Sequence, residues 1–238
     1  MALITGASRG IGKAVALRFA AEGAAIAFTH VTVSAAAEQT EQEIAALGVK
    51  VKRYVADAAD YAATEALVAD VVKEFGRIDI LVNNAAVDDE NGLDTIEQIT
   101  PSVIDDTFAV NVRGSILMMR EMIRHRGDYG RIINLSTDAS QIFAGQITYG
   151  ASKATLEALT RSIALEVAKY GITVNCVAPG PTQTGWIDED LEQAVLPLIP
   201  MGQLIQPDDI ADTILFLASE QARMLTGQVI KVSGGHAL

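Results

Sequence analysis

The sequence predicts a doubly wound α/β domain, in which a mostly parallel seven-stranded sheet is covered by helices on both faces. Seven short apolar runs alternate with segments whose apolar residues recur at helical spacing. Parallel strands need a long crossover connection, usually a helix, so this alternation favours a parallel sheet. The 238 residues are 50% hydrophobic, which supports a sizeable core. Because no linker, repeat or low-complexity tract interrupts the pattern, we expect residues 1–238 to form one domain.

The predicted elements follow one another along the whole chain. Strands are expected at 2–5, 24–29, 51–56, 78–83, 131–136, 173–178 and 228–232. Helices are expected at 11–23, 35–48, 63–76 and 207–219, with longer ones near 101–126 and 148–170. The first helix ends on a glycine and the last begins with a proline and two acids, which are typical helix boundaries. Right-handed βαβ crossovers would join the strands.

Composition excludes several classes of function. The formal charge of −12 and the isoelectric point near 4.6 argue against a nucleic-acid-binding surface. The single cysteine, Cys176, lies in an apolar run and is expected in the core. The three histidines share no metal-ligand spacing, so we expect no metal site. No run approaches the ~20 apolar residues of a membrane span, and no signal segment is evident, which indicates a cytoplasmic protein.

The turn between the first strand and the first helix reads TGASRGIG, residues 5–12. Its glycines, Gly6, Gly10 and Gly12, would let the backbone approach a pyrophosphate, which the helix N-terminus attracts by its N–H groups and positive dipole. Glycines also serve ordinary tight turns. Their place after the first strand and at a helix start nevertheless favours a dinucleotide-binding turn.

The end of the second strand bears on which dinucleotide would bind. A cofactor with a free 2′-hydroxyl usually meets an acid there, but FTHVTVS contains none before Glu38. Arg9 projects from the glycine turn instead, where a guanidinium could pair with a 2′-phosphate. This favours NADP(H). NAD(H) stays an alternative, because no second basic residue supports Arg9, which could instead be a solvated surface charge.

Together these motifs resemble the short-chain dehydrogenase/reductase family over essentially the whole chain. TGASRGIG looks like the family's TGxxxGxG loop, NNAA (83–86) like its NNAG segment, and Tyr149–Lys153 like its YxxxK signature. The resemblance implies a Rossmann-like fold and an NAD(P)-dependent enzyme acting on CH–OH groups. The cofactor-binding residues that it implies are Gly6, Ser8, Arg9, Gly10, Ile11, Gly12, Asp57, Asn84, Ala85, Tyr149, Lys153, Pro179, Gly180, Thr182 and Thr184.

The chemistry explains why a tyrosine and a lysine belong together. The cofactor supplies a hydride, and the protein must supply a proton, but an unperturbed tyrosine has a pKa near 10. Lys153 lies one helical turn after Tyr149 and should lower that pKa toward the working pH. The resemblance adds that Lys153 bonds the nicotinamide ribose and that Asn111 holds a water molecule for proton relay.

A further hydroxyl should hold the substrate oxygen, and two residues compete for that role. Counting about thirteen residues back from Tyr149, as the resemblance suggests, selects Ser136. Counting along the strand from Gly130 selects Thr137 instead. The two alternatives stay open, with Ser140 as an outside candidate and Asp138 as a turn former.

Two further stretches carry weaker signals. The segment at about 183–205 mixes apolar side chains with acids and is expected to close over the substrate as a lid, although a core or oligomer surface would look the same. The acids at 88–90 and 188–190 are expected to be solvated. We also expect a homo-oligomer, either a dimer or a homotetramer.

The leading hypothesis is an NADP(H)-dependent oxidoreductase that interconverts a ketone or aldehyde and the corresponding alcohol. Within the family, the sequence motifs are most similar to those of the 3-oxoacyl-carrier-protein reductases and the sugar and steroid dehydrogenases. A carrier-protein-linked reductase would need a basic patch, for which Arg124, Arg126 and Arg131 are candidates. A regulator that binds the cofactor without catalysis is a third possibility.

Overall fold

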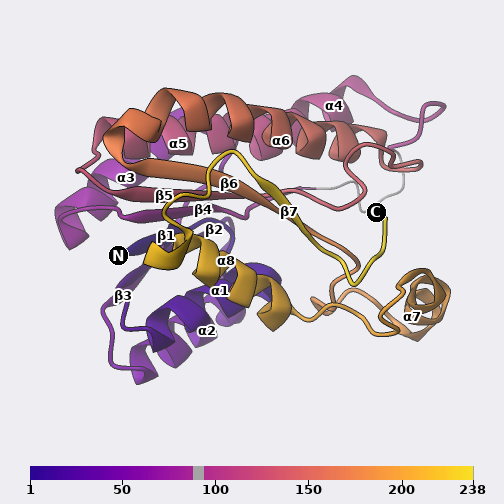
Figure 1. Ribbon diagram of the computed structural model, residues 1–238, viewed down its shortest axis with the longest axis horizontal. Coiled ribbons are helices and arrows are strands. Elements are labelled where there is room, and N and C mark those ends of the chain that lie inside the picture. The colour runs from indigo at the N-terminus through magenta and orange to yellow at the C-terminus, as the bar shows by residue number, and fades with distance from the viewer. Residues whose placement is uncertain (88–93, 238) are drawn as a thin grey trace.

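The computed structural model describes residues 1–87 and 94–237, and the ribbon shows a sheet between two layers of helices (Figure 1). The seven strands lie in the order β3-β2-β1-β4-β5-β6-β7, and every neighbouring pair is parallel. This confirms the predicted fold class. The strands are β1 (Ala2–Ile4), β2 (Ile26–His30), β3 (Val51–Val55), β4 (Ile80–Asn83), β5 (Gly130–Leu135), β6 (Ile172–Pro179) and β7 (Val229–Val232).

Helices cover both faces of the sheet. In Figure 1, α3, α5 and α6 lie above it, α1, α2 and α8 lie below it, and α7 stands apart on the right. The chain order also reverses between β1 and β4, and parallel sheets bind ligands at such a point. The helices are α1 (Gly10–Ala21), α2 (Ala35–Ala46), α3 (Tyr61–Phe75), α4 (Pro101–Phe108), α5 (Ser115–Arg124), α6 (Ile147–Val167), α7 (Glu189–Val195) and α8 (Pro207–Ala218).

Strand side chains alternate between two separate apolar cores, as the period of two requires. On β1, Ile4 packs into the core beneath the sheet, with Phe19 of α1 and Ile214 of α8. Leu3 packs into the core above the sheet, with Met119 of α5 among its partners. Since both faces are buried, the strands contain the nearly continuous apolar runs from which they were predicted.

The structure departs from the predicted helices in two places. The helix expected near 101–126 is interrupted by the π-helix η1 (Ala109–Gly114), which separates α4 from α5. Such a bulge often marks a functional position, and this one contains Asn111. The second difference is α7, which lies inside the expected lid and begins where the Asp188 side chain accepts a hydrogen bond from the Leu191 N–H at 2.9 Å.

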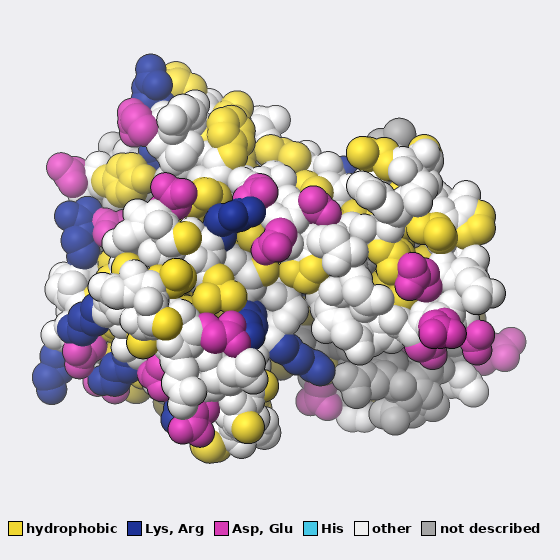
Figure 2. Space-filling view, turned by 90° about the horizontal axis from the view of Figure 1, so that it is seen from below, with side chains coloured by type: hydrophobic (Ala, Val, Ile, Leu, Met, Phe, Trp, Pro, Cys, Tyr) yellow, Lys and Arg dark blue, Asp and Glu magenta, His cyan; other side chains and the backbone are white. Residues whose placement is uncertain are grey.

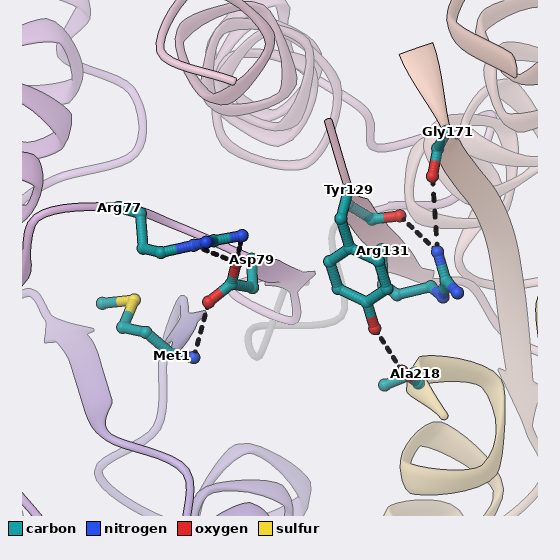
Figure 3. Close-up of polar contacts among 8 residues, drawn as sticks. Met1, Arg77, Asp79, Tyr129, Arg131, Gly171 and Ala218 are labelled. Carbon is teal, nitrogen blue, oxygen red and sulfur yellow. Dashed lines mark hydrogen bonds and ion pairs between the residues drawn. The ribbon is translucent and has the colours of Figure 1, made fainter. Parts of the chain in front are cut away.

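Charged groups connect the strands at their amino-terminal ends (Figure 3). Asp79, just before β4, accepts from the amino group of Met1 at 2.9 Å and pairs with Arg77 at 2.5 Å. The contact joins the beginning of β1 to the beginning of β4. The two strands that frame the point of reversal are therefore connected by charge as well as by the backbone ladder.

We expect Cys176 to be chemically inert in the folded protein. Its side chain on β6 is 0% exposed, and burial raises the pKa of the thiol to about 12. At pH 8 the reactive thiolate is then on the order of one molecule in ten thousand. Titration with a disulfide reagent should modify no thiol in the native protein and one thiol in denaturant. Rapid native labelling would contradict the buried placement of β6.

Candidate active site

The glycine turn after β1 lies directly against the NNAA segment after β4. The Thr5 hydroxyl accepts hydrogen bonds from the backbone N–H groups of Asn84 and Ala85, at 3.0 and 2.9 Å. The Asn84 side chain donates in return to the carbonyls of Thr5 and Gly6, both at 2.9 Å. Gly6 has a φ of +66°, and a Cβ there would lie 2.9 Å from the Ala85 Cα. This close approach therefore needs glycine at position 6.

Helix α1 begins immediately after this turn, with Arg9 at its N-cap and Gly10 and Ile11 in its first turn. The N–H groups of a first helical turn have no partner within the helix, and the dipole adds partial positive charge, so this terminus suits a pyrophosphate. Arg9 is exposed there. The carbonyl of Ser8 accepts the Thr40 hydroxyl at 3.1 Å, which holds the turn against α2.

The loop after β6 meets the glycine turn from the other side. Thr184 lies 3.2 Å from the point that a Cβ on Gly10 would occupy, so the two loops are in contact. The Thr182 hydroxyl donates to the Gly180 carbonyl at 2.8 Å and fixes the bend after Pro179. Asp57 is more distant: it follows β3, is exposed, and caps its own turn by accepting from the Ala59 N–H at 2.8 Å.

A cavity of about 430 Å³ connects these loops to the predicted catalytic residues. Its lining includes Ile11, Gly180 and Thr184 from these loops, together with Thr137 and Tyr149. A nicotinamide dinucleotide fits this arrangement, because the glycine turn leaves a cradle that a side chain would fill and the cavity continues from it. Among the described residues, no three His, Cys, Asp or Glu side chains gather as a metal site.

Tyr149 and Lys153 stand on the first two turns of α6, whose start is fixed by Asp94. The Asp94 carboxylate accepts the backbone N–H groups of Thr148 and Tyr149, at 2.9 and 3.0 Å, and its carbonyl accepts that of Ile147 at 3.1 Å. A carboxylate is favourable at this end of the helix dipole. Sequence analysis missed Asp94, because the 53 positions between it and Thr148 conceal the cap.

Lys153 is buried beside the tyrosine ring. Its ammonium lies 5.4 Å from the centroid of the Tyr149 ring and donates to the Leu135 carbonyl at 2.9 Å. Asn111 faces the same helix, where its side chain donates to the Ser152 hydroxyl at 3.0 Å. The Asn111 amide also exchanges two hydrogen bonds with the backbone of Val87, at 2.8 and 2.9 Å. The structure thus brings together Asn111, Tyr149 and Lys153, which the sequence grouped as catalytic.

The two competing hydroxyls lie in different environments. Ser136 is buried, and its hydroxyl donates to Glu157 at 2.8 Å and lies 3.3 Å from the Lys153 carbonyl. Ser140 donates to the same Glu157 oxygen at 2.6 Å. Thr137 is half-buried, and both Ser136 and Thr137 line the cavity together with Tyr149. Sequence analysis also missed Glu157. This residue lies one helical turn beyond Lys153 and accepts hydrogen bonds from both serine hydroxyls.

An aspartate–histidine pair completes the cavity. The Asp138 carboxylate and the His236 ring nitrogen Nδ1 are 2.7 Å apart, and both residues line the wall. Burial raises the pKa of the Asp138 carboxyl, while the hydrogen bond from His236 opposes the rise. Asp138 was expected to be a turn former, and it does begin a turn. Its partner 98 residues away was not expected.

The expected lid forms one wall of the same cavity. Ile187, Leu191 and Val195 line it, and Trp186 lines it while remaining 66% exposed. The acids at 188–190, at the start of α7, are exposed, whereas Glu192 is half-buried. Figure 2 shows acidic side chains gathered toward the right end of the face seen from below, the end at which Figure 1 places α7. The acids at 88–90 lie outside the described residues.

The basic patch proposed for a carrier protein is wrong for Arg131. That residue is 2% exposed, and its guanidinium stacks 4.3 Å from the centroid of the Tyr129 ring and donates to the Gly130 and Gly171 carbonyls at 2.9 and 3.4 Å (Figure 3). A guanidinium with neighbouring backbone acceptors and an aromatic face is stable when buried, which the sequence pattern did not reveal. Arg124 and Arg126 remain exposed.

Comparison with known proteins agrees with this geometry. Residues 6–237 match the family model described as enoyl-(acyl carrier protein) reductase. The chain is 40% identical to (2S)-[(R)-hydroxy(phenyl)methyl]succinyl-CoA dehydrogenase subunit BbsD of Thauera aromatica, covering 100% of this chain and 96% of the relative. It is 39% identical to the 3-oxoacyl-[acyl-carrier-protein] reductase FabG of Staphylococcus aureus, covering 98% and 96%.

Solved structures give the same result. A short-chain dehydrogenase/reductase from Serratia marcescens superposes with a TM-score of 0.94 at 36% identity, over 100% of this chain and 97% of that one. A blue fluorescent protein from a metagenomic library, solved in complex with NADPH, gives 0.94 at 33% identity over the same shares. No helix within the described residues is long and apolar enough to cross a membrane. With this fold, these motifs and these relatives, the chain belongs to the short-chain dehydrogenase/reductase family and is an oxidoreductase.

Proposed function

We propose that the protein is an NADP(H)-dependent oxidoreductase that interconverts a ketone or aldehyde and the corresponding alcohol. The observation that carries this proposal is the cavity that joins the Gly180–Thr184 loop to Tyr149 and Thr137. A nicotinamide held by that loop would face a carbonyl held by the two hydroxyls. When bound, the cofactor supplies the hydride in reduction and accepts it in oxidation.

The proton is the protein's contribution. In reduction, the Tyr149 hydroxyl gives its proton to the carbonyl oxygen. The Lys153 ammonium, which lies beside the ring, stabilises the phenolate that remains. Lys153 itself donates to the Leu135 carbonyl, which fixes the ammonium against the end of β5. Asn111 is proposed to support the water through which the proton is replaced.

We assign the substrate-holding hydroxyl to Thr137. The Ser136 hydroxyl is engaged by buried Glu157, and turning it toward a substrate would leave that carboxylate short of a donor. Both residues line the cavity with Tyr149, and Thr137 is the more exposed of the two. Its hydroxyl can donate to the carbonyl oxygen and strengthen that bond as negative charge develops.

The preference for NADP(H) rests on Arg9. Its position at the N-cap of α1 places a cation next to the cofactor turn, and β2 ends on a buried histidine where NAD-binding proteins of this fold usually have an acid. The similar blue fluorescent protein was solved with NADPH. These observations support the 2′-phosphorylated cofactor over NAD(H).

A 3-oxoacyl reductase is the second candidate. It is favoured by the similarity to FabG and by the apolar wall of Ile187, Leu191 and Val195, which could contact an acyl chain. The loss of Arg131 from the docking patch and the acidic first turn of α7 weigh against an acidic carrier protein. A regulator without catalysis fits less well, because Tyr149, Lys153 and Asn111 are assembled.

The homo-oligomer is likewise a proposal. Helices α5 and α6 share an outer surface with a hollow of about 530 Å³, lined by Ile116, Ile123 and Ile163 together with charged side chains that include Arg124 and Glu166. Leu165 on α6 is 84% exposed. Apolar surface of this kind on two adjacent helices suits a helical interface with a second copy.

Replacing Tyr149 with phenylalanine should abolish most turnover. The variant keeps the ring but loses the proton, so we expect kcat to fall by about 10² to 10⁴. NADPH should still bind within about ten-fold of the wild-type affinity, since the glycine turn is untouched. Absorbance at the nicotinamide band reports turnover, and fluorescence reports binding. Tyr170→Phe, far from the cavity, is the control; full activity in Tyr149→Phe would refute the proposed acid.

The two hydroxyls can be separated by paired substitutions. Thr137→Val should lower kcat/KM by about 10² with little change in stability, because it removes one donor to the developing charge. Ser136→Ala should instead lower the free energy of unfolding by about 1–3 kcal/mol in a urea titration, because Glu157 loses a buried donor. If Ser136→Ala is the more damaging to kcat/KM, the assignment is reversed.

Arg9→Ala should weaken NADPH binding about ten-fold or more while changing NADH binding by less than about three-fold. The expected size is that of one hydrogen bond to a charged group. Fluorescence titration of both cofactors measures the effect. Arg223→Ala removes the same charge from an exposed position near η4 (Glu220–Ala222) and serves as the control. Equal losses for the two cofactors would exclude contact with the 2′-phosphate.

A further inference from the structure

Helix α6 is capped by a residue that is distant in the chain. The N–H groups of a first helical turn have no partner within the helix, and the side chain just before the helix usually accepts one of them. At α6 that residue is Gln146, whose side chain makes no capping hydrogen bond and lines the cavity instead. Because Tyr149 stands in this first turn, its backbone depends on an acceptor from another part of the fold.

Asp94 accepts from three consecutive N–H groups of this turn. Its two carboxylate oxygens both accept from the Thr148 N–H at 2.9 Å, and one of them also accepts from the Tyr149 N–H at 3.0 Å. Its backbone carbonyl accepts from the Ile147 N–H at 3.1 Å. Asp94 is 1% exposed, so water does not compete for these bonds. A buried carboxylate without its donors is costly, which holds the turn in place.

A residue close to Asp94 in the chain holds a second predicted catalytic residue. Val87 follows β4, and its backbone exchanges two hydrogen bonds with the Asn111 side chain, at 2.8 and 2.9 Å. Asp94 comes shortly afterwards in the chain and holds the backbone of Tyr149. Asn111 and Tyr149 are thus each held by a residue from the part of the chain between β4 and α4.

The cap matters for chemistry because Tyr149 and Lys153 are anchored differently. Lys153 stands one turn deeper in α6 and donates to the Leu135 carbonyl at 2.9 Å. Tyr149 stands in the first turn, and helix ends fray when their N–H groups lack partners. Loss of Asp94 would therefore move the tyrosine ring while leaving the lysine in place. Proton transfer needs hydrogen-bond distance, and a displacement of about 1 Å can cost on the order of 10²-fold in rate.

We propose that Asp94 is a positioning residue for the proton transfer: it holds the backbone of Tyr149 at the distance from which the phenol can serve the substrate oxygen. Asp94 does not contact the substrate, because it is buried and lies outside the cavity lining. Its removal should therefore lower kcat and leave binding nearly unchanged. The inference rests on the proposed function only in taking Tyr149 to be the acid.

Steady-state kinetics with NADPH and cyclohexanone, acetophenone or ethyl 3-oxobutanoate test the role. Asp94→Ala should lower kcat by about 10²-fold, and Asp94→Asn, which keeps one acceptor oxygen, by about ten-fold, while KM and NADPH affinity change by less than about three-fold. Asp60→Ala is the matched control. Asp60 caps α3 by accepting from the Ala63 N–H at 3.1 Å, and α3 carries none of the predicted catalytic residues, so its kcat should stay within about two-fold of the wild type.

Amide hydrogen exchange, read by mass spectrometry, tests the cap without turnover. Asp94→Asn should speed exchange at the start of α6 and leave β5 unchanged, because the cap is local.

Three results would overturn the inference. They are unchanged exchange in Asp94→Asn, faster exchange with a kcat within about two-fold of the wild type, and a loss of kcat accompanied by faster exchange throughout the chain. A wild type that turns over none of the three carbonyls would instead refute the proposed function, and the exchange would still decide whether Asp94 holds Tyr149.

Discussion

The position of α6 against the end of β5 is the constraint on which the rest of the site depends. Lys153 donates to the Leu135 carbonyl, Ser136 donates to Glu157, and Asn134 donates to Thr160 at 2.9 Å. These contacts link the strand to three successive turns of the helix. Because each buried polar group is costly without its partner, the helix cannot slide along the strand without breaking several bonds at once. Tyr149 stands on the first turn of the same helix, so this seating places it.

The same polar system continues into the sheet. The Asn83 side chain on β4 donates to Asn134 on β5 at 2.8 Å, so the chain of hydrogen bonds runs from β4 through β5 into α6. The next residue, Asn84, holds the glycine turn after β1. Two adjacent asparagines therefore connect α6, which carries Tyr149 and Lys153, to the glycine turn after β1. An error in the packing of either would move the two halves of the site relative to one another.

The fold could be predicted because its signals are local. Strands buried on both faces contain apolar runs, and the helices between them repeat at 3.6 residues, so all seven strands were found within about two residues at each end. The π-helix around Asn111 could not be predicted this way, because its apolar pattern is that of an ordinary helix. The Asn111 side chain in this π-helix exchanges hydrogen bonds with the backbone of Val87, 24 residues away. Short-range periodicity cannot predict a contact at that separation.

The contrast between Ser136 and Thr137 is a part of the site that the sequence could have predicted. Ile133 and Leu135 pack into the core beneath the sheet, whereas Asn134 turns toward α6, and successive strand residues must alternate. Continuing that alternation just past the end of β5 sends Ser136 to the helix, where it donates to Glu157, a preference that the spacing to Tyr149 alone did not decide. The partners Asp94, Glu157 and His236 are different. Each acts through a residue more than fifteen positions away, so only the assembled fold brings them to the cavity and its helix.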